Sequence, residues 1–416
     1  MTVAAAAVAL SIAAFLVTVT GSQSDNAWLE GVARALTVGT PMAVGLFAMR
    51  RTPFTRFGQL LAITGAVWFV TTLANAGDPV LYSIGRVSAW IAEPLLVYLL
   101  LAFPTGRLTH PADRVIAALM VALVLVLYLP TALLVEAYPV PVPWTSCVES
   151  CPQNAFMVVD AEPALVEDVL RPLREVLTVA VFAAVAVQLA RRLFASTRLG
   201  RRALAPVLAV AWLHVAAFGA ILLGRLIAPD AKVLEVSVWA LTLGVPLTAL
   251  AFLAGLVRWW VYIATATQRL AARLRGHPDP ADLRDALAEA FDDRSLDVAY
   301  WIGDGDGHWA DAGGLPVAWP GAVAGRAVTE VRDGDRRIAA ILHDEALDGD
   351  RAFIDTATSY ALMTLDNHRL SAQTSALLRA VRESRARIQS AADDERRRIE
   401  RDLHDGAQQR LVALRI

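Results

Sequence analysis

Residues 115–135 read VIAALMVALVLVLYLPTALLV, a run of 21 residues without a charged side chain. A helix of about 20 apolar residues crosses the hydrocarbon core of a bilayer. The whole chain of 416 residues is 56% hydrophobic and has a mean hydropathy of +0.48, which is more apolar than an ordinary soluble domain. We therefore expect part of this chain to lie in lipid.

Seven other runs share this character, and the first of them is interpreted as a retained span rather than a removable signal peptide. The eight predicted spans cover residues 3–20, 32–49, 57–76, 83–103, 115–135, 173–190, 203–227 and 233–260. Arginines follow the second, fourth, sixth and eighth spans, at Arg50, Arg107, Arg191 and Arg258 among others, whereas the alternate connections are mainly acidic. Because basic residues collect on the cytoplasmic side, we expect a multi-pass protein in the lipid bilayer with both termini cytoplasmic.

The net charge bears on the class of partner, and the placement of the cysteines bears on whether they are bonded to each other. The net charge of −2 and the absence of a basic arm argue against nucleic acid as a partner. The two cysteines, Cys147 and Cys151, both fall in the segment predicted to lie outside between the fifth and sixth spans. A disulfide persists there, and four-residue spacing allows one, so we favour a disulfide over two free thiols. With no histidine nearby, a metal site at this pair is not expected.

The chain beyond residue 260 has the composition of a soluble region. A linker helix is predicted over 261–277, and a small cytoplasmic α/β domain, loosely GAF-like, over 278–350. Its predicted elements are a helix over 279–291 and strands over 298–302, 327–331 and 337–342, with Asp333-Gly334 as a hairpin turn. The glycine-rich stretch 303–307 is interpreted as a turn between strands, not as a calcium or phosphate loop. His308 and His343 are interpreted as structural.

Helix-forming residues run from 351 to the end, and residues 351–391 predict a signalling coiled coil. Its heptad seam comprises Leu370, Thr374, Leu377, Val381, Ser384, Ile388 and Ala391. After this seam, Ile399, Leu403, Ala407 and Leu411 follow in steps of four, which changes the local winding. We therefore expect a homodimer in which residues 392–416 begin a helical bundle.

Residues 394–411 read DERRRIERDLHDGAQQRL. Helical spacing places Asp405 and Gln409 as a stacked pair beside His404, so that a carboxylate and an amide lie near one imidazole. A carboxylate that accepts one ring N–H leaves the other nitrogen free for nucleophilic attack. The alternative is that these are ordinary surface residues of a charged helix. The interleaved arginines and acids of residues 393–402 are interpreted as a solvated, self-paired helix face.

Residues 395–411 closely resemble the dimerisation and phosphoacceptor segment of the NarL-type subfamily of bacterial two-component sensor histidine kinases. Its H-D-x-x-x-Q core is matched by His404, Asp405 and Gln409. The stretch FPTGR at 103–107 resembles an inner loop of actinobacterial members. The resemblance implies catalysis by His404 as phosphoacceptor, with Asp405 orienting it and accepting its proton. Gln409 would position water for dephosphorylation of a response regulator, and the location would be the bacterial plasma membrane.

ATP and Mg²⁺ are the cofactors that this resemblance implies, since phosphoryl transfer depends on positioning and charge neutralisation. No ATP-binding segment follows residue 416 in the sequence given, so residues 392–416 are interpreted as a truncated phosphoacceptor domain whose ATPase module is absent. The expected fold class is mainly α, with a polytopic membrane domain over 1–260, the α/β domain and the coiled coil. The leading hypothesis is a membrane sensor histidine kinase.

Two alternatives stay open. One is a membrane carrier or channel with a dimerising cytoplasmic tail, and the other is a truncated, non-catalytic modulator of an intact kinase. Glu93 and His214 lie within predicted spans, where an ionisable residue suggests function. A carrier would usually need more such groups, so we favour a kink at Glu93-Pro94 and core packing for His214.

Overall fold

The computed structural model describes residues 2–22, 24–51, 54–140, 142–143, 145–147, 151–195, 198–227, 232–274, 280–303, 307–318, 326–344 and 351–413. Within these ranges, the side chains of residues 2–3, 195, 198–200, 226–227, 280–281, 351–352, 360 and 401–413 lie outside the description. The chain forms two compact units, Met1–Tyr262 and Ile263–Ile416. It is mainly helical and contains one small antiparallel sheet, as predicted.

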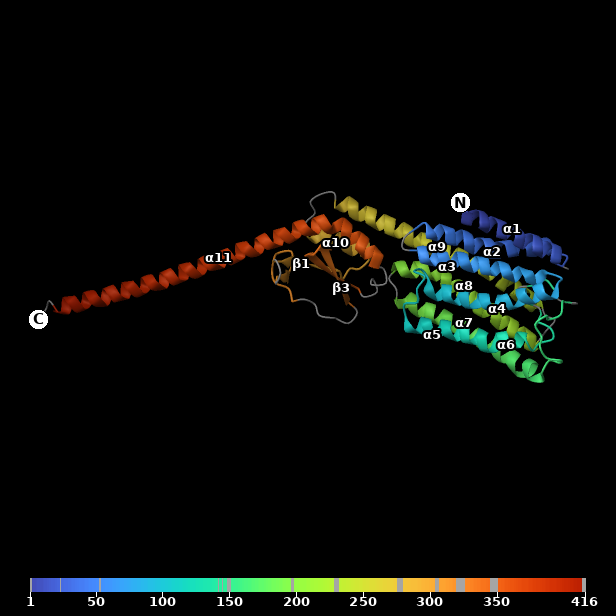
Figure 1. Cartoon of the computed structure of the whole chain (residues 1–416). Coiled ribbons are helices and arrows are strands. Elements are labelled where there is room, and N and C mark those ends of the chain that lie inside the picture. The colour runs from blue at the N-terminus through green and yellow to red at the C-terminus, as the bar shows by residue number, and fades with distance from the viewer. Residues whose placement is uncertain are drawn as a thin grey trace. The chain divides into compact units, whose positions relative to one another are not determined.

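The first unit is a bundle of helices running side by side (Figure 1). Its elements are α1 (Thr2–Gly21), α2 (Ala27–Met49), α3 (Thr55–Thr71), η1 (Thr72–Asn75), α4 (Pro79–Ala102), α5 (Pro111–Leu123), η2 (Val124–Tyr128), α6 (Leu129–Ala132), η3 (Val166–Leu170), α7 (Arg171–Ala195), α8 (Arg198–Ile227) and α9 (Lys232–Arg273). Among the described residues, eight helical segments are long and apolar enough to cross a membrane. The prediction of a membrane protein with eight spans is confirmed at this level.

Helix α9 is longer than a span. The sequence predicted a span over 233–260 followed by a linker helix over 261–277, and one unbroken helix runs from Lys232 to Arg273. Nothing in this stretch interrupts the backbone ladder, because Pro246 lies well before the predicted junction. The predicted stop at residues 276–278 lies outside the described residues.

The FPTGR stretch forms the turn that follows α4. The ring of Phe103 contacts Phe57 of α3 and Phe252 of α9, with ring centroids 5.4 and 5.3 Å apart. Gly106 has a positive φ of 75°, and a Cβ there would lie 2.8 Å from the Phe57 amide nitrogen, so this position requires glycine. Arg192 of α7 donates to the carbonyl oxygens of Leu101 and Phe103 at 2.6 and 2.8 Å. The motif is therefore a packed joint between helices.

The 133–165 segment connects α6 to η3 and is held on the bundle by two buried asparagines. Asn154 Nδ2 donates to the carbonyl oxygens of Ala132 and Val135 at 2.7 and 2.8 Å. Asn75 Oδ1 accepts hydrogen bonds from the amide and the hydroxyl of Ser146, both 3.0 Å long. A buried amide that uses its donors and acceptors in this way fixes the backbone around it.

Cys147 and Cys151 form a disulfide in the same segment, with their Cα atoms 5.6 Å apart. Residues 148–150 between them lie outside the described residues. The bridge closes a short loop next to Ser146, whose bonds to Asn75 attach it to the end of η1. The described residues contain no free cysteine.

The second unit contains α10 (Pro280–Phe291), a four-stranded sheet and α11 (Arg351–Ala413). The strands are β1 (Asp297–Ile302), β2 (His308–Ala310), β3 (Arg326–Asp333) and β4 (Arg336–Asp344), in the order β2-β1-β4-β3 and all antiparallel. The hairpin at Asp333-Gly334 forms as predicted, with Gly334 at φ 60° and Asp333 opposite Arg336. β1 and β2 pair on either side of the glycine-rich stretch, of which residues 304–306 lie outside the description.

The core of this unit lies between the sheet and the two helices. Phe291 of α10 packs edge-on against Phe353 of α11, with ring centroids 5.4 Å apart, and both are buried. His343 of β4 is fully buried, and its Nε2 lies 2.8 Å from the hydroxyl of Thr329 on β3. This cross-strand hydrogen bond is the structural role expected for His343.

Candidate functional site

The predicted phosphoacceptor residues lie on the last turns of α11. The helix includes positions 404, 405 and 409, but the side chains of His404, Asp405 and Gln409 lie outside the described residues. Their mutual geometry therefore stays a prediction. The structure adds that the same unbroken helix begins at Arg351, beside the sheet.

The charged helix face just before the motif is self-paired. Arg396 Nε lies 3.0 Å from Glu400 Oε1, and Arg398 Nη2 lies 2.9 Å from Glu395 Oε1. All four side chains are exposed, so each pair contributes only about 0.3–0.5 kcal/mol. These two exposed pairs agree with the interpretation of a solvated, self-paired face, and the side chains of Arg401 and Asp402 lie outside the described residues.

Between Leu370 and Ile399, α11 presents apolar side chains to solvent. Leu377, Val381 and Ile388 of the predicted seam are all exposed, whereas Phe353, Ile354, Ala357, Ala361 and Leu365 earlier in the helix are buried against the sheet domain. A second chain or another segment could bury these exposed side chains. The predicted coiled-coil partner would be such a chain.

A separate polar site lies inside the first unit. A cavity of about 90 Å³ is lined by residues of α4, η2, α7, α8, α9 and the 133–165 segment. Five charged side chains line it: Arg86, Glu93, Arg174, Glu175 and Arg225. Charged groups within membrane helices are costly and tend to mark functional sites.

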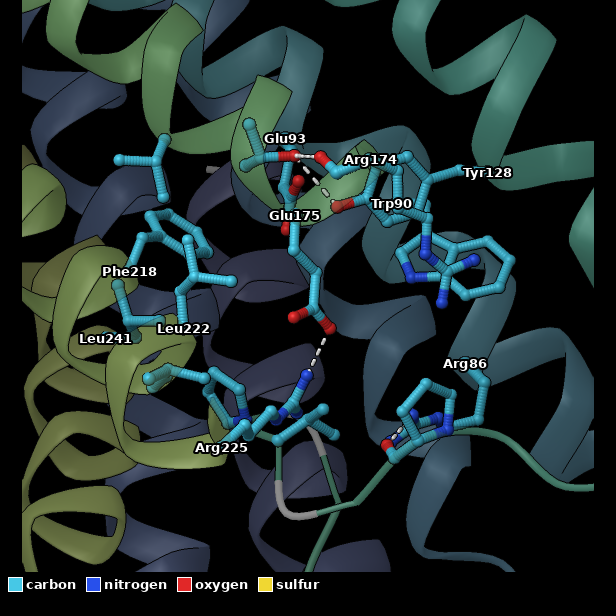
Figure 2. Close-up of a pocket in the computed structure, with 16 residues that line it drawn as sticks. Arg86, Trp90, Glu93, Tyr128, Arg174, Glu175, Phe218, Leu222, Arg225 and Leu241 are labelled. Carbon is cyan, nitrogen blue, oxygen red and sulfur yellow. Dashed lines mark hydrogen bonds and ion pairs between the residues drawn. The ribbon is translucent and has the colours of Figure 1, made fainter. Parts of the chain in front are cut away.

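Figure 2 shows how the two sides of this cavity differ. Phe218, Leu222 and Leu241 form an apolar side, whereas Trp90, Tyr128, Arg174 and Arg86 lie on the other, with Glu175 between the two groups (Figure 2). An apolar wall opposite a few fixed polar groups is the usual design of a small-molecule pocket.

Arg174 is held in place by aromatic rings. Its guanidinium carbon lies 4.7 Å from the ring centroid of Tyr128 and 5.3 Å from that of Trp90, which is cation–π distance. Nη1 donates to the hydroxyl of Thr131. Among the described residues, Nε has no hydrogen-bond partner. The side chain is 2% exposed, so this N–H is removed from solvent.

The hydroxyl of Tyr128 acts as a donor. Thr178 Oγ1 donates to the carbonyl oxygen of Arg174 at 2.8 Å and also lies 2.8 Å from the Tyr128 hydroxyl. Because a threonine hydroxyl has a single hydrogen, Tyr128 must donate to Thr178. This chain of bonds fixes the Tyr128 ring against the Arg174 guanidinium.

Arg86 connects the cavity to the 133–165 segment. Its Nη2 donates to the carbonyl oxygen of Pro139 at 2.7 Å, and its guanidinium carbon lies 5.6 Å from the Tyr138 ring. Burial raises the pKa of Tyr138 to about 12, so this phenol stays protonated and donates to Asn154 Oδ1 at 2.7 Å. Nη1 of Arg86 has no hydrogen-bond partner within the described part of the chain.

Glu93 lies next to Pro94 inside α4, as the sequence shows, but the expectation that it serves only a kink is incomplete. Its side chain lines the cavity, is 7% exposed, and has an Oε2 without a hydrogen-bond partner among the described atoms. His214 instead packs in the core as expected: its ring stacks on Phe182 at 5.8 Å and its Nδ1 lies 2.9 Å from the Val210 carbonyl oxygen.

No metal site appears in the described part of the chain, where no group of three His, Cys, Asp or Glu side chains could hold an ion. Comparisons with protein-family models, with curated proteins and with solved structures find no match to this chain. Function is therefore argued from the residues and their arrangement.

The sequence pattern did not single out the arginines of the cavity as site residues. Arg86, Arg174 and Arg225 each fall within a predicted span, as Glu93 and Glu175 do. A charged residue inside a span is a signal that sequence reasoning can use. What the sequence lacks is the information that these side chains, from three separate helices, meet in one cavity.

Proposed function

We propose that this protein is a membrane sensor histidine kinase of a two-component phosphorelay that is phosphorylated on His404. The observation that carries the proposal is the sequence of residues 395–411, with His404, Asp405 and Gln409 at the spacing of the NarL-type phosphoacceptor core. The phosphoryl group would then pass to an aspartate of a response regulator.

The continuity of α11 supports this proposal. The helix packs on the sheet at Phe353 and Ile354 and continues without a break to Ala413. A rotation or shift of the sheet domain would therefore be transmitted along one rigid element toward His404. The exposed seam at Leu377, Val381 and Ile388 fits a homodimer joined by a parallel coiled coil.

In this proposal, the chain itself contributes the phosphoacceptor and the residues beside it. Asp405 would accept one ring N–H of His404 and leave the other nitrogen as the nucleophile, and Gln409 would position water for the reverse reaction. ATP and Mg²⁺ supply the phosphoryl group and neutralise its charge. In the family that residues 395–411 resemble, an ATPase module binds both.

Three finer assignments belong to the same proposal. The small sheet domain is a GAF-like module, the membrane is the bacterial plasma membrane, and both termini are cytoplasmic. The arginine distribution supports the orientation, with Arg50, Arg107, Arg191 and Arg258 on one side. A reporter fused after Ile416 that is active only in the cytoplasm would test the orientation, and an inactive reporter would reverse it.

The phosphoacceptor assignment is tested by supplying the ATPase domain of a NarL-type kinase, with labelled ATP and Mg²⁺, to the purified chain. We expect an acid-labile phosphoryl adduct that is absent in His404→Gln. The matched control is His368→Gln, which lies on the same helix and should keep the adduct. An adduct that survives His404→Gln contradicts the assignment.

A carrier is the second candidate, because the cavity of the first unit contains buried charges from α4, α7 and α8. Such groups line substrate pathways in transporters. Flux measured in proteoliposomes separates the two candidates: flux abolished by Arg174→Gln would favour the carrier. A non-catalytic modulator would leave no adduct of its own but change the adduct yield of an intact kinase in a mixed dimer.

A further inference from the structure

We propose that the cavity of the first unit binds a small amphipathic monoanion, with its acidic group at Arg86 and Arg174 and its apolar part against Phe218, Leu222 and Leu241. This inference goes beyond the proposed phosphoacceptor function. It does not require His404 to be active, so either proposal can fail while the other holds.

The charges of the cavity favour an anion. Arg225 forms an ion pair with Glu175 and is thereby neutralised. In the described part of the chain, no carboxylate lies within ion-pair distance of Arg86 or Arg174, and Glu93 is the one carboxylate left on this wall. Two guanidinium groups beside one carboxyl group leave an excess of at least one positive charge.

The hydrogen-bonding groups of the same wall also point to an acceptor. Arg86 Nη1 and Arg174 Nε are buried N–H donors without a partner among the described residues. An unsatisfied buried donor costs about 1–3 kcal/mol, and more when it is charged. Water could accept these bonds but would not neutralise the charge. A carboxylate or phosphate does both, because its oxygens accept charge-assisted hydrogen bonds from guanidinium groups.

The apolar side limits what else the ligand carries. Phe218, Leu222 and Leu241 offer no hydrogen-bonding side chain, so a polyhydroxylated or multiply charged ligand would bury unsatisfied groups there. The cavity volume of about 90 Å³ fits on the order of six to nine non-hydrogen atoms, since one water needs roughly 10–15 Å³. Hexanoate, with its single carboxylate and short hydrocarbon chain, has this size and character.

Glu93 gives the proposal a directional test. It lines the same cavity and its Oε2 has no hydrogen-bond partner among the described residues. When ionised, it opposes an incoming anion. Replacing it with glutamine keeps the shape and removes any such charge, so Glu93→Gln should bind the anion at least as tightly as the unaltered chain.

The first experiment compares three ligands of nearly equal shape on the purified full-length chain in detergent: hexanoate, hexanamide and hexylamine. Affinity is measured by isothermal titration calorimetry. We expect hexanoate to bind at least tenfold more tightly than the neutral amide and the cationic amine. An amide or amine that binds as tightly as the acid overturns the proposal, as does the absence of hexanoate binding.

The second experiment locates the site with variants. Arg86→Gln and Arg174→Gln should each weaken hexanoate binding by roughly tenfold or more, and Glu93→Gln should not weaken it. Arg192→Gln, on α7 but away from the cavity, is the matched control and should leave the affinity unchanged. If neither arginine variant folds, the ligand series on the unaltered chain and the Glu93→Gln variant still decide. A Glu93→Gln variant that binds hexanoate more weakly than the unaltered chain contradicts the placement.

The anion could be a free acid or the phosphate of a lipid headgroup. Titrations in nanodiscs of phosphatidylcholine and of phosphatidylglycerol separate these sources. Equal hexanoate affinity in both supports a free acid. Hexanoate binding that is lost only in phosphatidylglycerol supports an anionic lipid as the occupant of the same arginines. The control variant Arg192→Gln should not restore the binding. Binding unaffected by Arg174→Gln in either bilayer overturns the proposal.

Discussion

Glu175 on α7 and Arg225 on α8 form an ion pair on the wall of the membrane cavity, between Oε1 and Nη1. Figure 2 shows the Glu175 carboxylate directed at Arg225. About a fifth of each side chain is exposed, 19% for Glu175 and 23% for Arg225. The pair joins neighbouring helices and also removes one arginine from the charge that a ligand would meet.

We expect Glu175→Gln and Arg225→Gln each to lower the free energy of unfolding by about 1–3 kcal/mol, because each leaves a charge without its partner. The double variant should cost less than the sum of the two single variants, since the second substitution removes the orphaned charge. Thermal unfolding of the purified protein measures the three values. Strict additivity would show that the pair has no coupling energy.

Gly45 of α2 and Gly58 of α3 allow a close crossing of these helices. A Cβ on either glycine would lie 2.6 Å from the carbonyl oxygen of the other, closer than side chains tolerate. Gly58→Ala should therefore force the helices apart and destabilise the protein by about 1–3 kcal/mol. Gly219→Ala is the control, because no atom of the described residues outside the local helix backbone lies within 4 Å of its Cβ position, and its unfolding temperature should not fall.

Asp293 makes the second unit sensitive to acid. Burial raises the pKa of Asp293, but hydrogen bonds from Ser295 and from the Asp344 amide, with the charge of Arg326, outweigh this and lower it below its ordinary 3.8. The stabilisation is thus complete above about pH 4 and is lost as the pH falls through the lowered pKa. Asp293→Asn should cost about 1–2 kcal/mol at neutral pH.

Hydrogen exchange of the β4 amides in the full-length chain measures this effect. The protection lost in Asp293→Asn should be largest at neutral pH and should shrink below about pH 4. Asp297→Asn is the control, because Asp297 is exposed and, among the described residues, its carboxylate accepts a single hydrogen bond, from the amide of Val298. A difference that grows toward acid pH would reverse the assigned sign.

The exposed seam of α11 predicts the oligomeric state. Leu377→Asp places a charge at a seam position and should shift the protein from dimer to monomer in light scattering, because a buried carboxylate has no partner in such a seam. Leu378→Asp is the matched control: Leu378 is also exposed but lies off the seam. Equal effects of the two substitutions would argue against this seam.

Signal transmission along α11 depends on helical register if the proposed function holds. One residue inserted between Ser384 and Ala391 rotates the downstream helix by about 100°. We expect it to change the yield of His404 adduct in the presence of the ATPase domain, whereas a seven-residue insertion restores the seam and should leave the yield near its original value. An unchanged yield after the single insertion contradicts a dependence of signal transmission on helical register.

Much of the fold follows from local sequence. The eight spans could be predicted because about 20 apolar residues suffice to cross a bilayer, whatever the neighbouring helices do. The Asp333-Gly334 hairpin could be predicted because its turn is set by a glycine at positive φ. The continuation of α9 past Trp260 could also be predicted, because the helical pattern continues there and no proline interrupts it before Arg273.

The candidate site residues also divide into those that local sequence indicates and those that only the tertiary structure brings together. The sequence by itself supplied the candidate phosphoacceptor, because residues 395–411 resemble a known phosphoacceptor segment and helical spacing sets which face His404, Asp405 and Gln409 share. Only the tertiary structure decided that Arg86, Glu93 and Arg174 line a common cavity. The reason is physical: groups on separate helices meet through the packing and rotation of those helices, which depend on contacts far apart in the chain and not on local spacing.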